Sequence, residues 1–395
     1  MSENLQRAGG SLAAVQTWAP SRPAKSVSES LRKLPQHDLH HEIVPGDSLG
    51  ASPALVEEWT ELARQVRAPP QQQPGWIEAW WSAFGTGSLE VHTVREDGRL
   101  IGVLPMARHR GILEAAANIH TPGFGVLADN PPSVADELAQ ALFSSEPRRI
   151  SLIDLDPGGE TFRAFMHAAH EAGYKVLLRP YQCSPYLQIT EPWAEYERRH
   201  LGKKWLKNLR RQRRQLGREG HLSLEIADGS NRLEDLLYEA YKVEASSWKG
   251  SNGTAIVSDR RVRGFYTGLA QWAAAQGLLR LFFLRLDGRP IAMYYLLEQH
   301  GVCHLLKTGY DSNFRLFSPG KILTLAVLEH CFAGELTRVE FYGNGERFKF
   351  FWAHAAIERV RFEAFAPSMA GRLREAAFVY ARPVAARLPT LGKRT

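Results

Sequence analysis

The sequence predicts an α/β protein with mixed sheets of the α+β kind, built from two tandem units that follow a disordered N-terminal leader. Three observations lead to this expectation. The 395 residues, 44% hydrophobic and 23% charged, are enough for two soluble domains with their own cores. Short apolar runs bounded by turn residues alternate with stretches of helical periodicity. This arrangement then occurs a second time further along the chain.

The repeat has two landmarks in the sequence. The segment Asp97-Gly98-Arg99-Leu100-Ile101-Gly102 returns as Asp287-Gly288-Arg289-Pro290-Ile291-Ala292, and Arg149-Ile150-Ser151-Leu152 returns as Arg338-Val339-Glu340-Phe341. The two separations are almost equal. Asp-Gly between alternating apolar runs is a strong hairpin signal, and two landmarks at one offset predict a duplicated unit.

Each unit is expected to contain helices, a β-hairpin, a further strand, a helix, a strand, and a closing helix and strand. Residues 1–40 are rich in Ser, Ala, Pro and Gln without apolar periodicity, which predicts the disordered leader. The predicted elements are a short strand at 42–44, helices at 55–66 and 73–84, hairpin strands at 89–94 and 100–107, a helix at 137–143, a strand at 149–155, a helix at 162–172, a strand at 175–180, and second-unit hairpin strands at 279–286 and 290–297.

A helix start in the second unit has the features of an anion site. An apolar strand at 303–308 leads through a polar turn to Ser318-Pro319-Gly320, where Ser suits the N-cap and Pro the first helical position. The free amides and the helix dipole at such a start attract anions. The residues expected around the anion are Tyr310, Arg315, Ser318, Gly320 and Lys321. The alternative is an ordinary capped helix packed on a sheet.

The Arg315-x-x-Ser318-x-Gly320 spacing resembles the pyrophosphate loop of GCN5-related N-acetyltransferases (GNAT). Together with other segments in order, it resembles the FemAB-type tandem acetyltransferase fold, and within it the BioF2-like acetyltransferase domain of CelD/BcsL cellulose-biosynthesis proteins. The other segments are 97–105 (DGRLIGVLP), Glu244-x-x-Ser247-Trp248-Lys249-Gly250, Asp287-Gly288-Arg289-Pro290-Ile291-Ala292, Ser318-Pro319-Gly320-Lys321 and Phe348-Lys349-x-x-Trp352.

The resemblance covers about 42–367 and implies a division into domains. We expect a leader at 1–40, an N-terminal GNAT-like domain at 41–190, a C-terminal GNAT-like domain at 191–367, and a C-terminal helix with a basic tail at 368–395. In the N-terminal domain the turn at 120–125 is glycine-rich, but no helix start flanked by Arg or Lys comes after it at the right distance. The C-terminal domain is therefore expected to bind the acyl donor, and the degenerate N-terminal domain to shape the acceptor cleft.

Acyl transfer from a thioester to an amine needs a base, an oxyanion stabiliser and an acid for the leaving thiolate. Glu340 and Tyr342 lie two apart on a predicted strand and would share one face, so Glu340 is the candidate base and Tyr342 or Tyr310 the candidate acid. By resemblance, Lys349 among aromatic residues would stabilise the oxyanion or a donor phosphate. The alternatives are a surface glutamate, core tyrosines and a lysine that covers aromatic faces.

Two further segments have predicted binding roles. Glu244, Trp248 and Lys249 precede a glycine-rich loop and are expected to line the acceptor cleft, although a plain helix end fits them equally well. Residues 198–218 are predicted to be helical and contain ten Lys or Arg and no acid. This segment could contact a polyanion, such as tRNA, a nucleotide-linked sugar or an anionic lipid surface, or it could be a solvated helix face.

The remaining features limit the class of protein. No run of uncharged apolar residues is long enough to span a membrane, and no signal peptide is evident. Cys183, Cys303 and Cys331 lack metal-ligand spacing and are predicted to be buried thiols in a reducing cytoplasm, so no metal is expected.

The sequence thus predicts a cytoplasmic acyltransferase that uses acetyl-CoA or another acyl-CoA as co-substrate. Its acceptor would be a sugar or another precursor of the cell envelope or of exopolysaccharide. Two alternatives stay open. One is a FemAB-type aminoacyltransferase that uses aminoacyl-tRNA, and the other is a non-catalytic scaffold in polysaccharide assembly.

Overall fold

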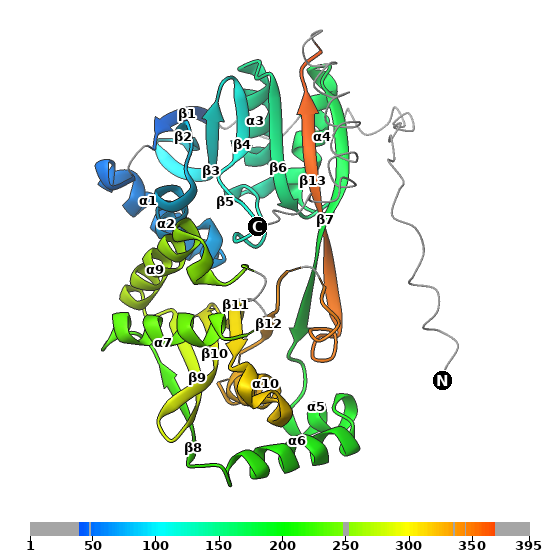
Figure 1. The fold of residues 1–395 in the computed structure, drawn as a ribbon. Coiled ribbons are helices and arrows are strands. Elements are labelled where there is room, and N and C mark those ends of the chain that lie inside the picture. The colour runs from blue at the N-terminus through cyan, green and yellow to red at the C-terminus, as the bar shows by residue number, and fades with distance from the viewer. Residues whose placement is uncertain (1–38, 47–48, 248–252, 335, 344, 368–395) are drawn as a thin grey trace, which may run out of the picture.

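The computed structural model describes residues 39–46, 49–247, 253–334, 336–343 and 345–367. Most of the predicted leader and the whole predicted C-terminal tail, 368–395, lie outside the described residues. The first strand begins at Leu39, so the last two residues assigned to the leader belong to the fold. Two parts are visible in Figure 1, here called the first half (39–190) and the second half (191–367).

The first half contains a curved sheet with helices packed on it, in the order expected from the sequence. Its elements are β1 (Leu39–Pro45), the short helix η2 (Leu49–Ala51), α1 (Pro53–Gln65), η3 (Pro70–Gln72), α2 (Pro74–Phe84), β2 (Ser88–Glu96), β3 (Arg99–His109), β4 (Ile112–Ala115), β5 (Leu127–Ala128), α3 (Pro131–Ser144), β6 (Arg149–Leu155), α4 (Glu160–Glu171) and β7 (Lys175–Gln188).

After two additional helices the second half repeats this order, except that among the described residues no helix lies between its last two strands, so the closing helix expected for this unit was wrong. Its elements are α5 (Trp193–His200), α6 (Lys203–Leu216), β8 (Leu222–Ala227), α7 (Leu233–Ala245), η4 (Ile256–Ser258), α9 (Arg260–Ala275), β9 (Leu279–Leu286), β10 (Arg289–Gln299), β11 (Val302–Tyr310), η5 (Ser312–Phe317), α10 (Pro319–Ala333), β12 (Arg338–Glu340) and β13 (Ala355–Phe365). The predicted α/β class with mixed sheets is confirmed.

The duplication is confirmed by the register of two short parallel ladders. In the first half β4 pairs with β6 from Ile112↔Arg149, and in the second half β11 pairs with β12 from Val302↔Arg338. Each ladder extends over three residue pairs. The same sequence landmark therefore occupies the same structural position in both halves.

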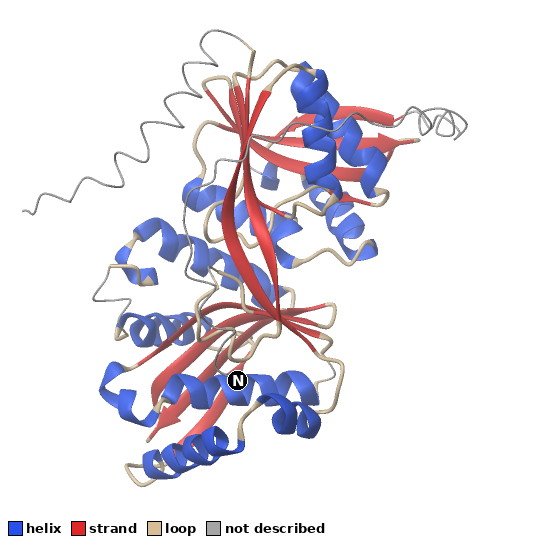
Figure 2. Ribbon diagram, turned by 90° about the vertical axis from the view of Figure 1, so that its right-hand side faces the viewer, coloured by secondary structure: helices blue, strands red, loops and turns tan. Residues whose placement is uncertain are grey.

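Two long strands join the halves into one sheet of thirteen described strands, as Figure 2 shows. The strand order is β1-β2-β3-β4-β6-β13-β7-β12-β11-β10-β9-β8, with β5 paired to β3. β7 is much longer than predicted and reaches β12, while β13 inserts between β6 and β7. The C-terminal strand of the predicted second domain thus completes the sheet of the first half. The boundary between 190 and 191 remains a sequence prediction.

The helices also connect the halves through a shared core. α2 from the first half packs against α9 from the second, where the Trp76 and Phe265 rings lie 5.6 Å apart, and both are fully buried. Burial of large aromatic side chains is among the strongest contributions to stability. Separate cores lie under α3 and α4 in the first half and under α6 and α10 in the second.

The basic segment differs from its prediction. Residues 198–218 form the end of α5 and then α6, because Leu201 and Gly202 adopt extended conformations between the two helices. Glycine disfavours a helix interior, and the side chain of Leu201 is buried at this break. The prediction of one continuous helix was wrong.

Candidate active site

The ladder between β11 and β12 ends after His304↔Glu340, and the two parallel strands then diverge. β11 continues to Tyr310 beside β10, whereas β12 ends at Glu340. A β-bulge interrupts the β10–β11 register between Lys307 and Leu305, so the peptide of Leu306 stands outside that ladder. Diverging parallel strands with a bulge at the point of separation create a place where backbone amides can meet a ligand.

Tyr342 and His304 meet beside this point of separation. The Tyr342 hydroxyl lies 2.5 Å from Nδ1 of His304. Burial lowers the pKa of His304 to about 3, with help from Arg338, so the imidazole is neutral at pH 7. Burial raises the pKa of Tyr342 well above its usual value, so the phenol keeps its proton.

Glu340 has the electrostatic character expected of a base. Burial raises the pKa of its carboxyl, while the nearby guanidinium of Arg338 opposes the shift. Nε of Arg338 lies 2.6 Å from Oε1 of Glu340, and the glutamate side chain is 13% exposed. The expected shared strand face with Tyr342 is wrong, because β12 ends at Glu340 and Tyr342 has a positive φ of 51°.

Lys349 lies on the segment between β12 and β13. Its Nζ donates to the carbonyl oxygen of Tyr342 at 2.7 Å and lies 2.7 Å from Oε2 of Glu346. A Cβ on Gly343 would come within 2.5 Å of this Nζ, so glycine at 343 permits the contact. The lysine therefore fixes the backbone turn that carries the Tyr342 phenol.

The predicted anion loop lies at the other end of β11. α10 begins at Pro319, as expected, but Ser318 has a positive φ of 54° and its side chain makes no capping hydrogen bond. Arg315 and Lys321 are exposed on this loop. Tyr310 packs against it, since a Cβ on Gly320 would lie 3.2 Å from the tyrosine ring. Tyr310 is therefore separated from Tyr342 by most of β11.

Of the three residues predicted to line the acceptor cleft, Glu244 lies among the described residues. Glu244 is fully buried near the end of α7, and its Oε2 accepts a hydrogen bond from the amide of Ile256 at 2.8 Å. Gly309 allows this helix to approach β11, since a Cβ there would lie 2.5 Å from Cα of Glu244. Trp248 and Lys249 lie outside the described residues. Glu244 thus orders the backbone next to β11 from within the core.

Several residues near the site were not predicted. Lys307 extends from β11 over the ring of Tyr266 at 5.0 Å, and the partly buried His120 of the first half lies 5.7 Å from the same ring, where burial lowers its pKa to about 4. On β13, the guanidinium of Arg359 acts electrostatically on Glu340 and Tyr342. The His304 imidazole in an apolar strand was visible in the sequence, but the approach of His120 and Arg359 depends on how the halves fold together.

The corresponding position in the first half is closed by its own chain. After β4 the loop turns back, and Gly123 donates its amide hydrogen to Oδ2 of Asp154 at 2.6 Å. The amide of Phe124 donates to the carbonyl oxygen of Asp154 at 3.2 Å. Asp154 is 1% exposed, and burial raises its pKa. This loop occupies the space into which the β4–β6 ladder opens.

The predicted thiols are only partly confirmed as buried. Cys303 and Cys331 are buried, but Cys183 is only partly buried, so that prediction was right for two of the three. Among the described residues, no three His, Cys, Asp or Glu side chains are grouped as metal ligands usually are. A search of the described helices also finds none with the length and apolar character of a membrane span.

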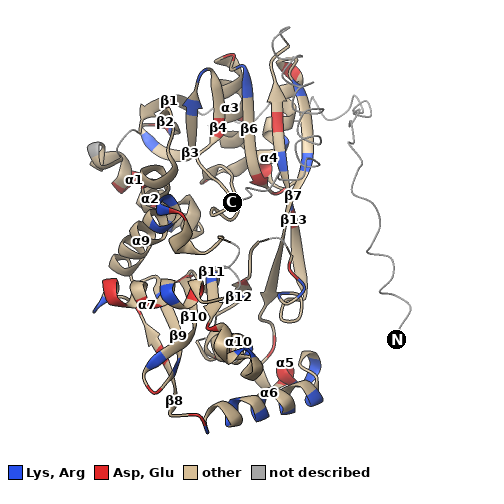
Figure 3. Cartoon of the chain, in the orientation of Figure 1, with Lys and Arg blue, Asp and Glu red and all other residues tan. Residues whose placement is uncertain are grey.

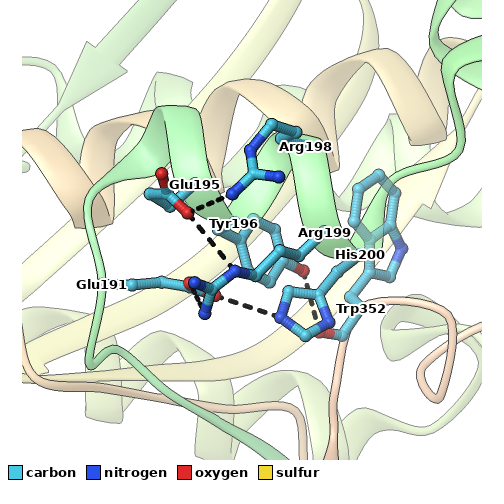
Figure 4. A network of polar contacts seen from close by, with 7 residues as sticks. All are labelled: Glu191, Glu195, Tyr196, Arg198, Arg199, His200 and Trp352. Atoms are coloured by element: carbon cyan, nitrogen blue, oxygen red, sulfur yellow. Dashed lines mark hydrogen bonds and ion pairs between the residues drawn. The ribbon is translucent and has the colours of Figure 1, made fainter.

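On α5 the cations are neutralised by neighbouring acids, as Figure 4 shows. Arg198 pairs with Glu195 at 2.7 Å, and Arg199 pairs with Glu191 at 3.0 Å. The ring of His200 approaches the same Glu191 at 3.0 Å. The network is tied to the segment before β13, because Tyr196 donates its hydroxyl hydrogen to the carbonyl oxygen of Trp352 at 2.9 Å.

The comparisons with known proteins agree with the resemblance to GNAT proteins noted in the sequence. Residues 203–350 match the family model described as an acetyltransferase (GNAT) domain. The chain therefore contains a GNAT domain in a tandem GNAT/FemAB-like fold. No curated protein matches the sequence.

Solved structures with a similar fold include the following two. One is FemX, with 12% identity and a TM-score of 0.55 over 81% of this chain and 98% of that chain. The other is the C-terminal domain (DUF2156) of a protein described as a lysylphosphatidylglycerol synthetase from Agrobacterium fabrum, with 12% identity and a TM-score of 0.50 over 82% of this chain and 95% of that chain. At 12% sequence identity, these similarities show a shared fold and nothing more specific.

Proposed function

We propose that this protein transfers an acyl group from an acyl-CoA to an amine or hydroxyl of a sugar or another cell-envelope precursor. The observation that carries the proposal is the opening of the β11–β12 ladder, with the helix start of α10 at one end and Glu340 and Tyr342 at the other. A donor with a phosphate group and a long arm ending in a thioester fits this layout. We retain the predicted cytoplasmic location.

The donor end of the site would hold phosphate. Pro319 has no amide hydrogen, and the amides of Lys321 and Ile322 donate to the carbonyl oxygen of Ser318. The amide of Gly320 and the positive end of the α10 dipole favour an anion, and the exposed cations Arg315 and Lys321 add charge of the right sign. The donor arm would then run along β11 toward the bulge. The amide of Leu306 is the candidate donor to the oxyanion that forms when the thioester carbonyl is attacked.

The proton steps use the other end of the site. Glu340 takes a proton from the attacking amine or hydroxyl, for which its raised pKa is an advantage. Tyr342 gives its phenolic proton to the departing thiolate. This step requires the His304 tautomer with hydrogen on Nδ1, which donates to the phenol oxygen and leaves the phenol hydrogen for the sulfur. Lys349 keeps the Tyr342 backbone in place.

The first half would contribute to the acceptor side. His120 lies within electrostatic range of Lys307 on β11, and Arg359 lies within electrostatic range of the proposed base. Both are positioned by contacts that involve the first half, since a Cβ on Gly123 would lie 3.8 Å from Nη2 of Arg359. These polar groups fit a hydroxylated or charged acceptor better than an apolar one.

Calorimetric titration with acetyl-CoA tests the donor assignment. We expect micromolar binding by the natural protein and loss of binding in Arg315→Glu/Lys321→Glu. The matched control is Arg260→Glu/Arg263→Glu, which reverses two exposed cations on α9 and leaves the loop that leads to α10 unchanged. Equal binding by all three proteins would refute the donor site, and no binding by the natural protein would refute acyl-CoA as donor.

A second candidate donor is aminoacyl-tRNA. Its support is the fold shared with FemX and the row of cations on α6. This function predicts tRNA binding that weakens steeply with salt. A filter-binding series with aminoacylated tRNA distinguishes the two donors, and activity with neither donor across a panel of amino sugars would favour a scaffold.

A further inference from the structure

The outer surface of α6 has a high positive charge that the reaction does not require. Figure 3 shows Lys and Arg following one another along this helix. Leu206 and Leu209 are buried, so the opposite side, with Lys204, Lys207 and Arg211, faces solvent. Among the ion pairs of the described chain, α6 takes part through Arg210, which pairs with an acid of α5. The outward cations therefore lack the neutralisation seen on α5.

Leu316 and Phe351 are exposed apolar side chains along one flank of the same helix, and the exposed Phe348 precedes Phe351 by three residues. Leu316 is 76% exposed, Phe348 is 50% exposed and Phe351 is 37% exposed. The rings of Trp205 and Phe351 are 4.5 Å apart, and Nε2 of Gln212 donates to the carbonyl oxygen of Leu316 at 3.1 Å. Because positions 205 and 212 are seven residues apart, they share a helix flank. Leu316 and Phe351 therefore border the same side of α6.

We propose that the basic-apolar surface, defined as Lys204, Lys207, Arg211, Leu316, Phe348 and Phe351, binds the face of a membrane that contains anionic lipids. Cations on the outer side of a helix would meet lipid phosphates, and the neighbouring apolar side chains would enter the headgroup layer. Large exposed apolar groups next to a cluster of charges of one sign are typical of an interaction site.

The apolar part of the surface decides between a membrane and a nucleic acid. A nucleic acid would use the cations and could stack bases on the phenylalanine rings, but the most exposed member, Leu316, is aliphatic and offers no ring for stacking. An aliphatic side chain gains free energy when it enters the acyl boundary of a bilayer. Such contact would be peripheral, and it would place the opening between β11 and β12 near a membrane-held acceptor.

Vesicle co-sedimentation without donor or acceptor tests this proposal. The probes are phosphatidylcholine vesicles with and without phosphatidylglycerol, at low and high salt. We expect binding only to vesicles with phosphatidylglycerol and weakening with salt. Lys204→Glu/Arg211→Glu should lower the partition coefficient at least about 20-fold, since each cation near an anionic surface contributes roughly fivefold. Leu316→Ser/Phe348→Ser should lower it about tenfold.

Two control variants keep the test specific. Arg260→Glu/Arg263→Glu reverses the same charge on α9, and Tyr238→Ser removes a 68% exposed aromatic residue from α7. Both should sediment like the natural protein. Absence of vesicle binding at low salt would overturn the proposal. So would a pattern in which the charge variant loses tRNA and vesicle binding equally while Leu316→Ser/Phe348→Ser loses neither. Neither result depends on whether the protein binds acyl-CoA.

Discussion

The two halves contain the same short parallel ladder but use it differently. In the first half β4 ends at Ala115, and the next loop folds back so that Gly123 and Phe124 donate amide hydrogens to Asp154. In the second half β11 continues to Tyr310 and leads through the short helix η5 to the start of α10. The comparison teaches that the segment after one strand decides whether a duplicated framework stays open to a ligand or becomes a closed support.

The side chains at matching ladder positions also differ. Glu340 on β12 pairs with His304 and remains partly exposed, whereas the matching Ser151 on β6 pairs with Glu114 and is buried. The hydroxyl of Ser151 donates to Oε1 of Glu363 at 3.0 Å. One half therefore presents an ionisable group at the opening, and the other uses the same position for a buried hydrogen bond.

The largest expected effect is on the rate of acyl transfer. Glu340→Gln keeps the size of the side chain but removes the proposed base, so kcat should fall about 10²–10⁴-fold. Ser151→Ala changes the matching residue of the first half and should leave kcat unchanged. Steady-state thioester turnover measures both. A similar loss in the two variants would mean that the halves do not differ in the way proposed.

The pH dependence of turnover tests whether Glu340, the ionisable group at the open ladder of the second half, acts as the base. Because burial raises the pKa of Glu340, kcat/KM should rise with pH through an apparent pKa above that of an ordinary carboxyl, and fall about tenfold per pH unit below it. The carboxylate is the active form, so the loss occurs on the acid side. Turnover measured from acidic to neutral pH should show this limb. Its persistence in Glu340→Gln would assign the titration to another group.

Matching hairpin positions should differ in stability. A Cβ on Gly102 would lie 2.1 Å from Cγ1 of Val134, whereas the second half has Ala292 at this position. Gly102→Ala should lower the free energy of unfolding by about 1–3 kcal/mol through overpacking. The reverse change, Ala292→Gly, should cost only about 0.5–1 kcal/mol. Urea denaturation measures both, and equal losses would contradict the difference in packing.

A comparable effect on stability is expected at the closed opening of the first half. Asp154→Ala leaves the amide of Gly123 without its acceptor, which should cost about 1–3 kcal/mol of unfolding free energy. Asp154→Asn keeps an acceptor oxygen and tolerates the positive φ of this residue, so it should cost less. Neither variant should change the stoichiometry of acetyl-CoA binding. A second bound donor in Asp154→Ala would show that closure alone disables the first half.

Local sequence signals were sufficient for most elements. The Asp-Gly turns, the alternating apolar runs and the Ser318-Pro319 helix start predicted the hairpins and the start of α10, because turn chemistry and side-chain periodicity depend on nearby residues. The break at Leu201 and Gly202 was missed because ten cations masked a glycine signal. The turn at Tyr342 was missed because strand alternation was extended past the end of the ladder.

The sequence by itself determined the duplicated order of elements, the basic segment and the candidate donor loop. Only the tertiary structure decided that β13 inserts between β6 and β7, that His304 meets Tyr342, and that Asp154 closes the first half. The physical reason is distance along the chain. Strand partners and buried polar pairs of this kind form between residues far apart in sequence, where neighbouring residues carry no information about the partner that packing selects.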